Sequence, residues 1–397
     1  MKNIIVSITV LFITIVTVLI YPKVNQSLAN QQTINAQTNI ENTVLHVSED
    51  IPRIQLAILL DTSNSMDGLI DQAKNQLWQV VNEFSLSKKN GITPRLEVAV
   101  YEYGNDNLSS ENGYIRLVTP LTTELDQVSE ALFSLSTNGG SEYCGYVIDT
   151  AVRQLSWSIS DNDIRTIFIA GNEPFTQGPV VYSDAITAAQ EKRISVNTIH
   201  AGDYNEGSVS GWKDGAILAG GDYMSINHNH QIVHVIAPQD QRIAELNSLL
   251  NNTYVPYGAF GKIKHERQLA EDKKSLEISE GLMAKRAESK ASKLYNNRSW
   301  DLVDAVKEES VEIESIPADE LPEEMQSMKS EERKAYVSEK AREREQIQNE
   351  IASLSRQRKT WVAQQPSTPD ADTLDEAIIS VVRKQARSKS YEFVKEE

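Results

Sequence analysis

The apolar run Ile54–Leu60 constrains the fold of this 397-residue chain more than any other feature. Almost every position in it is apolar and none is Gly or Pro, the pattern of a strand buried on both faces of a parallel sheet. Apolar residues then recur at helical spacing from Leu69 to Phe84, which predicts an amphipathic helix. Strands and helices in this order build α/β folds. The sequence therefore predicts an α/β domain that begins here.

The same alternation of strand-like and helix-like segments continues as far as Leu250. It predicts one domain over residues 49–260, with a mostly parallel sheet and helices on both of its faces. The length of this stretch suits a single domain. Further strands are expected at Leu96–Tyr103, Ile115–Val118, Arg165–Ala170, Ser195–His200 and Tyr223–Ile226, and further helices at Leu125–Leu135, Tyr146–Trp157, Val181–Lys192, Trp212–Ala219 and Asp240–Leu250.

Polar residues with metal-binding chemistry follow the first strand directly. Asp61, Ser63 and Ser65 lie just past its carboxyl end, where open α/β sheets place their ligand sites. One carboxylate and two hydroxyls are hard oxygen donors of the kind that Mg²⁺ prefers. The alternative interpretation is a turn that caps the next helix, since Asp and Ser also favour such positions.

The D-x-S-x-S pattern between this strand and this helix resembles the metal-ion-dependent adhesion site of von Willebrand factor type A (vWA) domains. The resemblance covers residues 50–240, and its motifs also look like those of a set of exported bacterial vWA proteins. It implies a Rossmann-like fold around a six-stranded, mostly parallel sheet. It also implies that Asp61, Ser63 and Ser65 coordinate Mg²⁺, or a similar ion such as Mn²⁺ or Ca²⁺, the Asp partly through water.

A second segment, L-S-T-N-G-G-S-E-Y-C over residues 135–144, corresponds to the loop that carries the next metal ligand of the family, usually a Thr. Ser141 falls at that position and keeps the hydroxyl, and Glu142 is an alternative oxygen donor. The pair Gly139-Gly140 lets the backbone approach closely. A plain Gly-rich connection is the alternative interpretation.

A third segment departs from the family pattern. The family usually ends the strand at residues 165–170 in T-D-G, with the Asp near the metal, whereas this chain has A-G-N. Gly171 stands at the aspartate position, so Asn172 or Glu173 would have to fill the gap. The loss of one carboxylate leaves Asp61 as the single strong carboxylate, and a degenerate, empty site is the alternative.

Residues 261–397 differ from the domain before them, because they are highly charged and their sparse apolar residues recur at helical spacing. We expect long charged helices in this C-terminal region, in part a coiled coil, with a partly disordered tail as the alternative. A last helix is expected at Thr373–Tyr391, where the apolar run Ile378–Val382 could dock on another surface, of this chain or of a partner.

The N-terminus carries an export signal. Lys2 precedes a long apolar run, Ile4–Tyr21, and Ser27-Leu28-Ala29 offers a small-x-small cleavage site. Residues 1–29 are therefore either a cleaved signal peptide or a retained anchor, because the run approaches the about 20 residues of a membrane span. A polar linker follows at residues 30–48. In both cases we expect the rest of the chain in the periplasm or on the extracytoplasmic face of the membrane.

Charge and cysteine content restrict the function. The formal net charge is −17, and residues 1–261 hold 14 Lys and Arg against 27 Asp and Glu, so this half should repel nucleic acid and anionic membrane surfaces. Cys144 is the only cysteine, which excludes an intramolecular disulfide. The sequence has no nucleophile elbow, no H-E-x-x-H motif and no Walker loop.

We therefore expect a non-enzymatic, divalent-cation-dependent protein-binding module of the cell envelope, acting in adhesion or as a scaffold. Its partner would be a protein that offers an acidic side chain to the metal. One alternative is a structural or assembly protein with a degenerate metal site that acts through its helical C-terminal region. An enzyme that depends on Cys144 or on a metal is favoured least, because no histidine lies near this cysteine in the sequence.

Overall fold

The computed structural model describes residues 51–227, 235–365 and 374–393. The described residues from Pro52 onward belong to one compact unit. The expected signal peptide or anchor at residues 1–29 and the linker at residues 30–48 lie outside the described residues. Among the helices of the described ranges, none combines the length and the apolar character that a membrane crossing requires.

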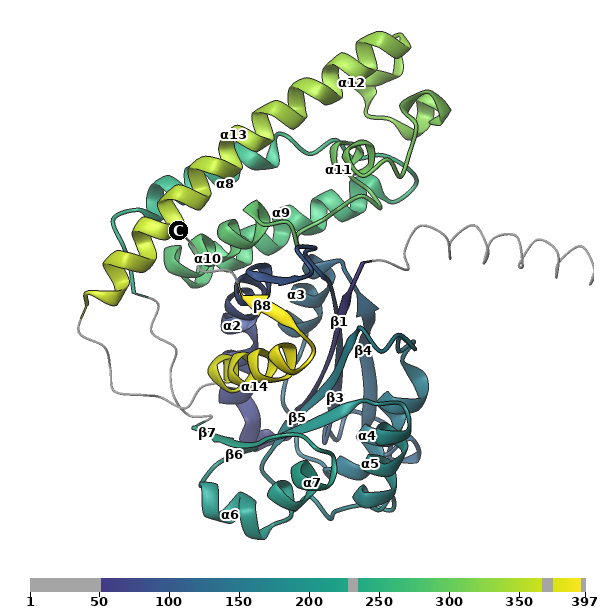
Figure 1. Ribbon diagram of the computed structural model, residues 1–397, viewed down its shortest axis with the longest axis vertical. Helices are drawn as coiled ribbons and strands as arrows, with labels where there is room; N and C mark the ends of the chain where they lie inside the picture. Colours follow the sequence, from purple (N-terminus) through teal and green to yellow (C-terminus); the bar gives the residue numbers. More distant parts are fainter. Residues whose placement is uncertain (1–50, 228–234, 366–373, 394–397) are drawn as a thin grey trace, which may run out of the picture. The chain divides into compact units, whose positions relative to one another are not determined.

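A six-stranded sheet lies between layers of helices in the lower half of Figure 1, in the order β4-β3-β1-β5-β6-β7. Neighbouring strands run parallel except for β3 and β4, which are antiparallel. The predicted α/β class and the mostly parallel six-stranded sheet are thus confirmed. The strands are β1 (Arg53–Asp61), β3 (Arg95–Tyr103), β4 (Ile115–Thr122), β5 (Ile164–Gly171), β6 (Ser195–Ala201) and β7 (Tyr223–Ile226).

Helices cover both faces of this sheet, as predicted (Figure 1). Successive side chains of a strand point to opposite faces, and β1 shows this: Leu56 and Ile58 belong to one hydrophobic core, Ala57 and Leu59 to the other. The first core contains α2 (Asp67–Ser85), α3 (Leu125–Phe133) and α14 (Leu374–Ser388), and the second contains α4 (Cys144–Gln154), α5 (Tyr182–Glu191) and α7 (Trp212–Leu218).

Strand β4 is longer than the sequence indicated. It was expected to end at Val118, before Thr119 and Pro120, but it continues to Thr122. Pro120 is tolerated because β4 lies at the edge of the sheet. On its open side no neighbouring strand needs a hydrogen bond from the N–H that proline lacks. The register against β3 shifts near Val100, which accommodates the irregularity.

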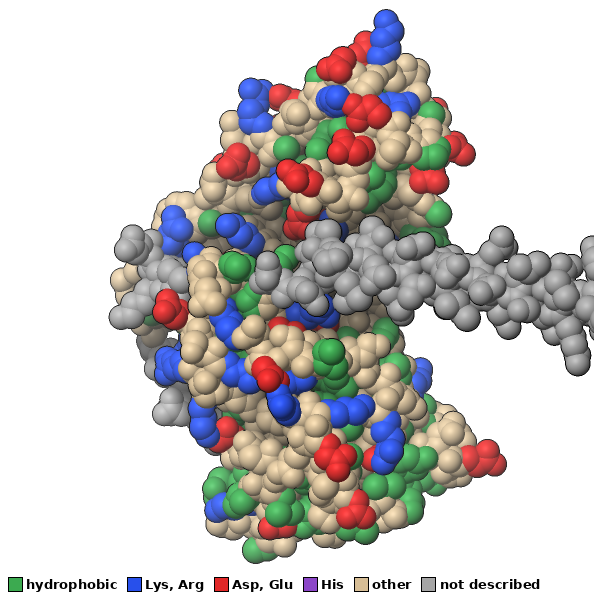
Figure 2. All heavy atoms as spheres, turned by 45° about the vertical axis from the view of Figure 1, so that its right-hand side comes forward, with side chains coloured by type: hydrophobic (Ala, Val, Ile, Leu, Met, Phe, Trp, Pro, Cys, Tyr) green, Lys and Arg blue, Asp and Glu red, His purple; other side chains and the backbone are tan. Residues whose placement is uncertain are grey.

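The C-terminal region is helical and charged, as predicted, with Lys, Arg, Asp and Glu interspersed over its surface in the upper part of Figure 2. It shares the first hydrophobic core with the sheet domain, because α10 packs on α2. Its helices are α9 (Gly261–Ile278), α10 (Glu280–Ala291), α11 (Leu302–Lys307), α12 (Glu323–Gln326) and α13 (Ser330–Ala363). Helix α8 (Asp240–Asn251), which was expected within the sheet domain, packs on α10 and α13 of this region. Short elements complete the chain: η1 (Asn64–Met66), β2 (Ser87–Lys89), η2 (Ser110–Asn112), α6 (Tyr204–Val209), η3 (Ile313–Ser315), η4 (Ala318–Glu320) and β8 (Tyr391–Phe393).

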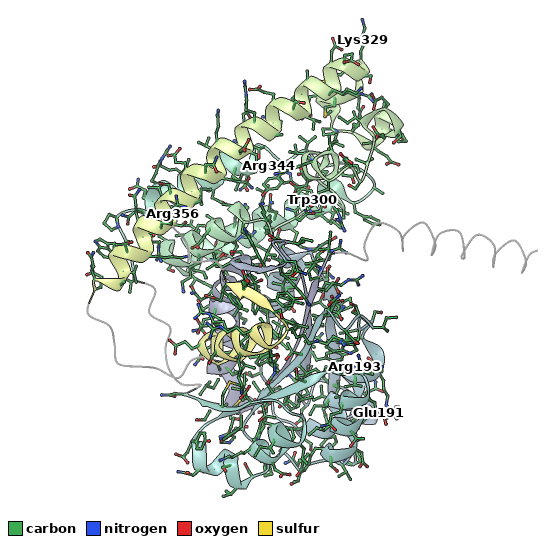
Figure 3. The ribbon with its side chains drawn as sticks, viewed as in Figure 1. Glu191, Arg193, Trp300, Lys329, Arg344 and Arg356 are labelled. Atoms are coloured by element: carbon green, nitrogen blue, oxygen red, sulfur yellow. The ribbon has the colours of Figure 1, made fainter. Side chains whose placement is uncertain are left out.

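Buried charges hold the long helix α13 in place. Val337, Arg344, Ile351 and Arg358 recur every seven residues along its buried side, and Arg344 is labelled in Figure 3. Arg344 Nη1 lies 2.6 Å from a carboxylate oxygen of Asp301, in the segment before α11. This stripe faces α8, α10 and α11 of the same chain, and a coiled coil remains a prediction.

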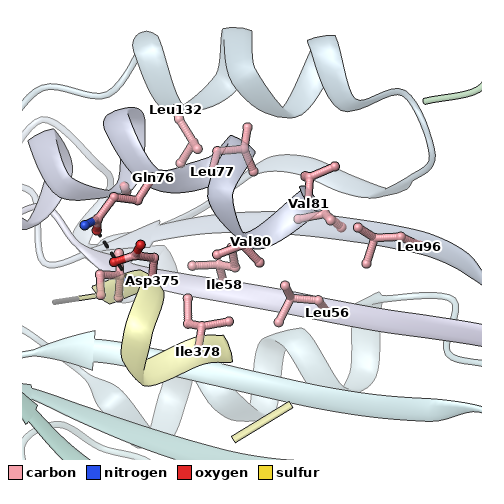
Figure 4. Close-up of a pocket in the computed structure, with 13 residues that line it drawn as sticks. Leu56, Ile58, Gln76, Leu77, Val80, Val81, Leu96, Leu132, Asp375 and Ile378 are labelled. Atoms are coloured by element: carbon pink, nitrogen blue, oxygen red, sulfur yellow. Dashed lines mark hydrogen bonds between the residues drawn. The ribbon is translucent and has the colours of Figure 1, made fainter. Parts of the chain in front are cut away.

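The last helix docks on the sheet domain, as its apolar run suggested. Ile378 of α14 lies across from Ile58 of β1 in the lining of a cavity of about 20 Å³ (Figure 4), which has room for about one water molecule. The backbone N–H of Asp375 donates to Gln76 Oε1 at 3.4 Å. After α14 the chain forms β8, which pairs with β2 in antiparallel fashion. The helix predicted to reach Tyr391 therefore ends at Ser388.

Candidate metal centre

Asp61 lies at the topological switch point of the sheet. From β1 the chain continues to β3 and β4 on one side of this strand. It then crosses to the other side of β1, where it forms β5 and the remaining strands of the sheet. Open α/β sheets bind ligands in the crevice at such a point, beyond the carboxyl ends of the strands. Asp61 ends β1 beside Tyr103, its register partner at the end of β3, and Gly171 ends β5.

The residues of the D-x-S-x-S pattern form one polar cluster. The backbone N–H of Ser63 donates to Asp61 Oδ1 at 2.8 Å. The hydroxyls of Ser63 and Ser65 lie 3.3 Å apart, and Asn172 Nδ2 donates to Ser65 Oγ at 3.1 Å. Neither η1 nor α2 receives a side-chain cap, so the helix-capping interpretation does not explain these side chains. Asp61 and Ser63 are buried whereas Ser65 is exposed, which means that the cluster opens to solvent at Ser65.

Glu142 contributes the second carboxyl of this cluster. Its side chain is buried and lies close enough to Asp61 for the two carboxyls to share a proton. A Cβ added to Gly104 would lie 2.7 Å from Glu142 Cγ and 2.9 Å from Asp61 Oδ1, so both side chains press against this glycine. Ser141 is half-buried, and its hydroxyl forms no hydrogen bond with these groups within the described ranges. The structure thus joins Glu142 to Asp61, while metal binding by Ser141 stays a prediction.

Tyr103 explains why a glycine replaces the usual aspartate at position 171. Its hydroxyl donates to the carbonyl oxygen of Ala170 at 3.0 Å. A Cβ at position 171 would lie 2.5 Å from this hydroxyl oxygen and 3.0 Å from Asp61 Oδ2. An aspartate therefore has no room there. Of the two residues expected to fill the gap, Asn172 reaches Ser65, whereas Glu173 is exposed.

The charged forms of the two carboxyls need compensation by a proton or by a cation. Burial raises the pKa of Asp61 to about 6, although hydrogen bonds with Glu142 and Ser63 oppose this shift. Burial and the adjacent Asp61 raise the pKa of Glu142 to about 9. Within the described part of the chain, three buried oxygens, Asp61 Oδ2, Glu142 Oε2 and Asn172 Oδ1, accept no hydrogen bond. Two carboxyls, two hydroxyls and an amide oxygen form a donor set that suits Mg²⁺, Mn²⁺ or Ca²⁺, so the residues fit a divalent ion.

Tyr103 and Asn105, at the end of β3 and just past it, also support the site. Besides Tyr103, Asn105 is buried and its Nδ2 donates to the carbonyl oxygen of Ser136 at 2.9 Å. This bond holds the loop after β3 against the loop that leads to Glu142. In the sequence, both residues were marked only by their position at the end of a strand. A residue in that position can either pack in the core or support a site, and the sequence alone does not distinguish the two roles.

Cys144 lies behind the cluster. It is buried, with its sulfur 3.8 Å from the Tyr103 hydroxyl oxygen. Burial raises the pKa of its thiol, and the nearby carboxyls of Asp61 and Glu142 raise it further. Since the thiolate is the reactive form, this environment keeps the sulfur unreactive.

Comparison with known proteins gives distant matches. No protein-family model and no curated protein sequence matches this chain. Among solved structures, an aerotolerance-related membrane protein from Bacteroides fragilis has 16% sequence identity and a TM-score of 0.31, over 44% of this chain and 93% of that chain. The SpRpn10 VWA domain has 15% identity and a TM-score of 0.32, over 46% and 91% respectively.

A third structure, proximal thread matrix protein 1 from the mussel byssus with a zinc-occupied MIDAS motif, has 12% identity and a TM-score of 0.32. The match covers 44% of this chain and 42% of the mussel protein. Similarities of this size carry no conclusion about activity, so the function of this protein has to be inferred from its own strand order and side chains.

Proposed function

We propose that the protein is an exported, non-enzymatic binding module of the cell envelope that holds a divalent cation at the carboxyl end of β1. One observation carries the proposal: Asp61 and Glu142 bring two buried carboxyls together, and neither forms an ion pair with a Lys or Arg among the described residues. Such a pair needs a proton or a metal ion for compensation. Asp61, Ser63, Ser65 and Glu142 would hold the ion, with Ser141 as a further ligand.

Protein binding is favoured by the surface around this site. A bound divalent ion would supply a positive centre for an acidic side chain of a partner protein. The loops after β5 and β6 lie at the same end of the sheet as Asp61 and carry exposed apolar side chains at Val181, Tyr204 and Val209, which is 86% exposed. Apolar residues around a polar centre are a feature of protein interfaces. The buried thiol of Cys144 gives no support for an enzyme that uses this cysteine.

Isothermal titration calorimetry tests the metal site. Mg²⁺ and Mn²⁺ are titrated into the full chain, since the C-terminal helices share the hydrophobic core with the sheet. We expect one binding event that Asp61→Asn and Glu142→Gln weaken at least about tenfold, the effect of losing one charged contact. Glu111→Gln is the matched control, because Glu111 is exposed in η2, after β3. No metal binding by the unmodified chain would refute the proposal.

A second experiment tests the partner. The immobilised chain is exposed to envelope extract with Mg²⁺ or with a chelator, and the Asp61→Asn variant is run in parallel. Proteins retained only by the unmodified chain in the presence of Mg²⁺ would support a metal-dependent partner. Equal retention in all samples would contradict the metal dependence.

An assembly role for the helical region is the second candidate. Exposed apolar residues at Phe260, Ile263, Leu269 and Leu276 lie on or next to α9 and would suit contact with another protein. Light scattering on the unmodified chain and on Ile263→Lys tests this candidate. A concentration-dependent oligomer that the substitution disperses, unaffected by chelator, would favour assembly over metal-dependent binding.

A further inference from the structure

A second cleft, with a volume of about 350 Å³, lies at the opposite ends of the strands from Asp61. The first residues of β5 and β6 and the last turn of α14 line it. Its lining contains three cationic side chains, Arg165, Arg193 and Lys389, and no carboxylate. This composition is unexpected in a chain with 56 Asp and Glu against 39 Lys and Arg.

Arg165 is a buried cation with unused hydrogen-bonding capacity. It is 4% exposed, and its Nη1 donates to the carbonyl oxygen of Ser158. Within the described ranges, Nε and Nη2 have no hydrogen-bond partner. Asp163 lies near enough to act on the guanidinium, but its two carboxylate oxygens accept from the backbone N–H of Arg53 and from the Ser158 hydroxyl. A buried hydrogen-bond donor without a partner lowers the stability of the fold. An acceptor that binds to Nε–H and Nη2–H of Arg165 would remove this cost.

The other two cations add positive charge to the same cleft. Lys389 is half-buried, and among the described residues its Nζ donates to two main-chain oxygens, those of Asp161 and Asp163. Burial lowers the pKa of Lys389, and repulsion from Arg165, Lys89 and Arg193 lowers it further, while Asp163 opposes the shift. Arg193, labelled in Figure 3 just past α5, is exposed and pairs with Asp161. The cleft therefore holds cations that repel one another and are only partly neutralised.

We propose that this cleft binds a phosphate group. The Nε–H and Nη2–H of Arg165 form a planar fork that would donate to two oxygens of an anion at once, and Lys389 and Arg193 would add charge from the side. Arg165 and Lys389 have no carboxylate partner in the described part of the chain, so two positive charges of the cleft need compensation. A dianion supplies two negative charges, whereas a monocarboxylate supplies one. The volume exceeds that of a phosphate ion and falls in the range of small-molecule sites, so the phosphate can be free or part of a small monoester.

Calorimetry on the full chain, in chelator and at constant ionic strength, tests the proposal with inorganic phosphate and with glycerol phosphate as probes. We expect saturable binding that Lys389→Gln and Arg193→Gln each weaken about tenfold, the effect of one charge-assisted hydrogen bond. Arg387→Gln is the matched control, since Arg387 is exposed in the last turn of α14, two residues before Lys389, and does not line the cleft. Tighter binding of glycerol phosphate than of phosphate would identify a monoester as the ligand, and equal binding would identify the free ion.

Two results would overturn the proposal. One is the absence of saturable binding of either probe at millimolar concentration. The other is an equal loss of affinity in the control and in the cleft variants, because this would show a diffuse charge effect. Thermal unfolding provides a second measurement: phosphate should raise the melting temperature of the unmodified chain and of Arg387→Gln, but not that of Arg165→Gln. If Arg165→Gln does not fold, the two surface variants decide.

Discussion

The fit between Gly171 and Tyr103 gives a prediction that can be worked through from the structure. Gly171→Ala would place a Cβ 2.5 Å from the Tyr103 hydroxyl oxygen and 3.0 Å from Asp61 Oδ2. Tyr103 is fully buried, so its ring cannot swing into solvent. The hydroxyl would have to shift by several tenths of an ångström, which would weaken its 3.0 Å hydrogen bond to the carbonyl oxygen of Ala170.

The cost of this substitution has three contributions. Overpacking a close-packed core by one methyl group costs about 1–3 kcal/mol, and weakening a buried hydrogen bond costs up to about 1 kcal/mol. Replacing glycine by alanine returns about 0.4–1 kcal/mol, because the unfolded chain becomes less flexible. We therefore expect Gly171→Ala to lower the free energy of unfolding by about 1–3 kcal/mol. In the background of Tyr103→Phe the clashing oxygen is absent, and the same change should cost less than about 1 kcal/mol.

Urea denaturation of the four proteins of this double-mutant cycle, in chelator at neutral pH, measures the coupling. Tyr103→Phe alone should cost about 1 kcal/mol, because it removes one hydrogen bond. A coupling free energy of at least about 1 kcal/mol would show that the hydroxyl is what excludes a side chain at position 171. An equal cost of Gly171→Ala in both backgrounds would refute this reasoning and would point to Asp61 instead.

Three further predictions concern charge and packing. The pKa of Glu142 is raised from 4.5 to about 9, so its proton stabilises the metal-free fold fully below pH 4.5, and this contribution is lost as the pH rises toward 9, at up to about 1.4 kcal/mol per pH unit. Melting in chelator should show this slope. Glu142→Gln should remove it above the raised pKa of Asp61, which is about 6. Arg286→Met removes the buried cation that pairs with Asp126 at 2.8 Å and with Asp272 at 2.6 Å. Asp272 keeps its ion pair with Lys290, but the buried Asp126 is left without an ion pair among the described residues, so we expect a cost of about 3–5 kcal/mol in urea denaturation. The exposed Arg342→Met should have little effect, and equal effects would contradict the role of burial. Ile378→Ala should cost about 2–5 kcal/mol if α14 is integral to the core, and a much smaller loss would show that α14 is only loosely attached.

The local pattern of the sequence was sufficient for most of the fold. Apolar runs such as Ile54–Leu60 and the helical spacing over Leu69–Phe84 correspond to β1 and α2 in the structure. These patterns are reliable because strand and helix periods are set by the backbone of a few neighbouring residues. The short elements β2 and β8 were not predicted, because each has three residues and exists only through pairing with the other, about three hundred positions away in sequence.

Part of the candidate site was also predictable from the sequence. The place of Asp61 after an apolar strand identified the loop and its first three oxygen donors. Glu142 was an alternative to Ser141 in the sequence, and only the folded structure shows Glu142 against Asp61. The sequence also suggested that the glycine at position 171 leaves Asp61 as the single carboxylate, which the position of Glu142 corrects.

The sequence by itself thus determined the order of strands and helices, the charged helical region and the strand end that carries Asp61. The tertiary structure decided which carboxyl faces Asp61, that a side chain at position 171 would press against Tyr103 and Asp61, and that α14 packs on one face of the sheet. The physical reason is the same in each case. Periodicity and turn chemistry are local properties of the sequence. The contact between Tyr103 and the end of β5 depends instead on the register of three strands. The docking of α14 depends on a core built from residues far apart in the chain.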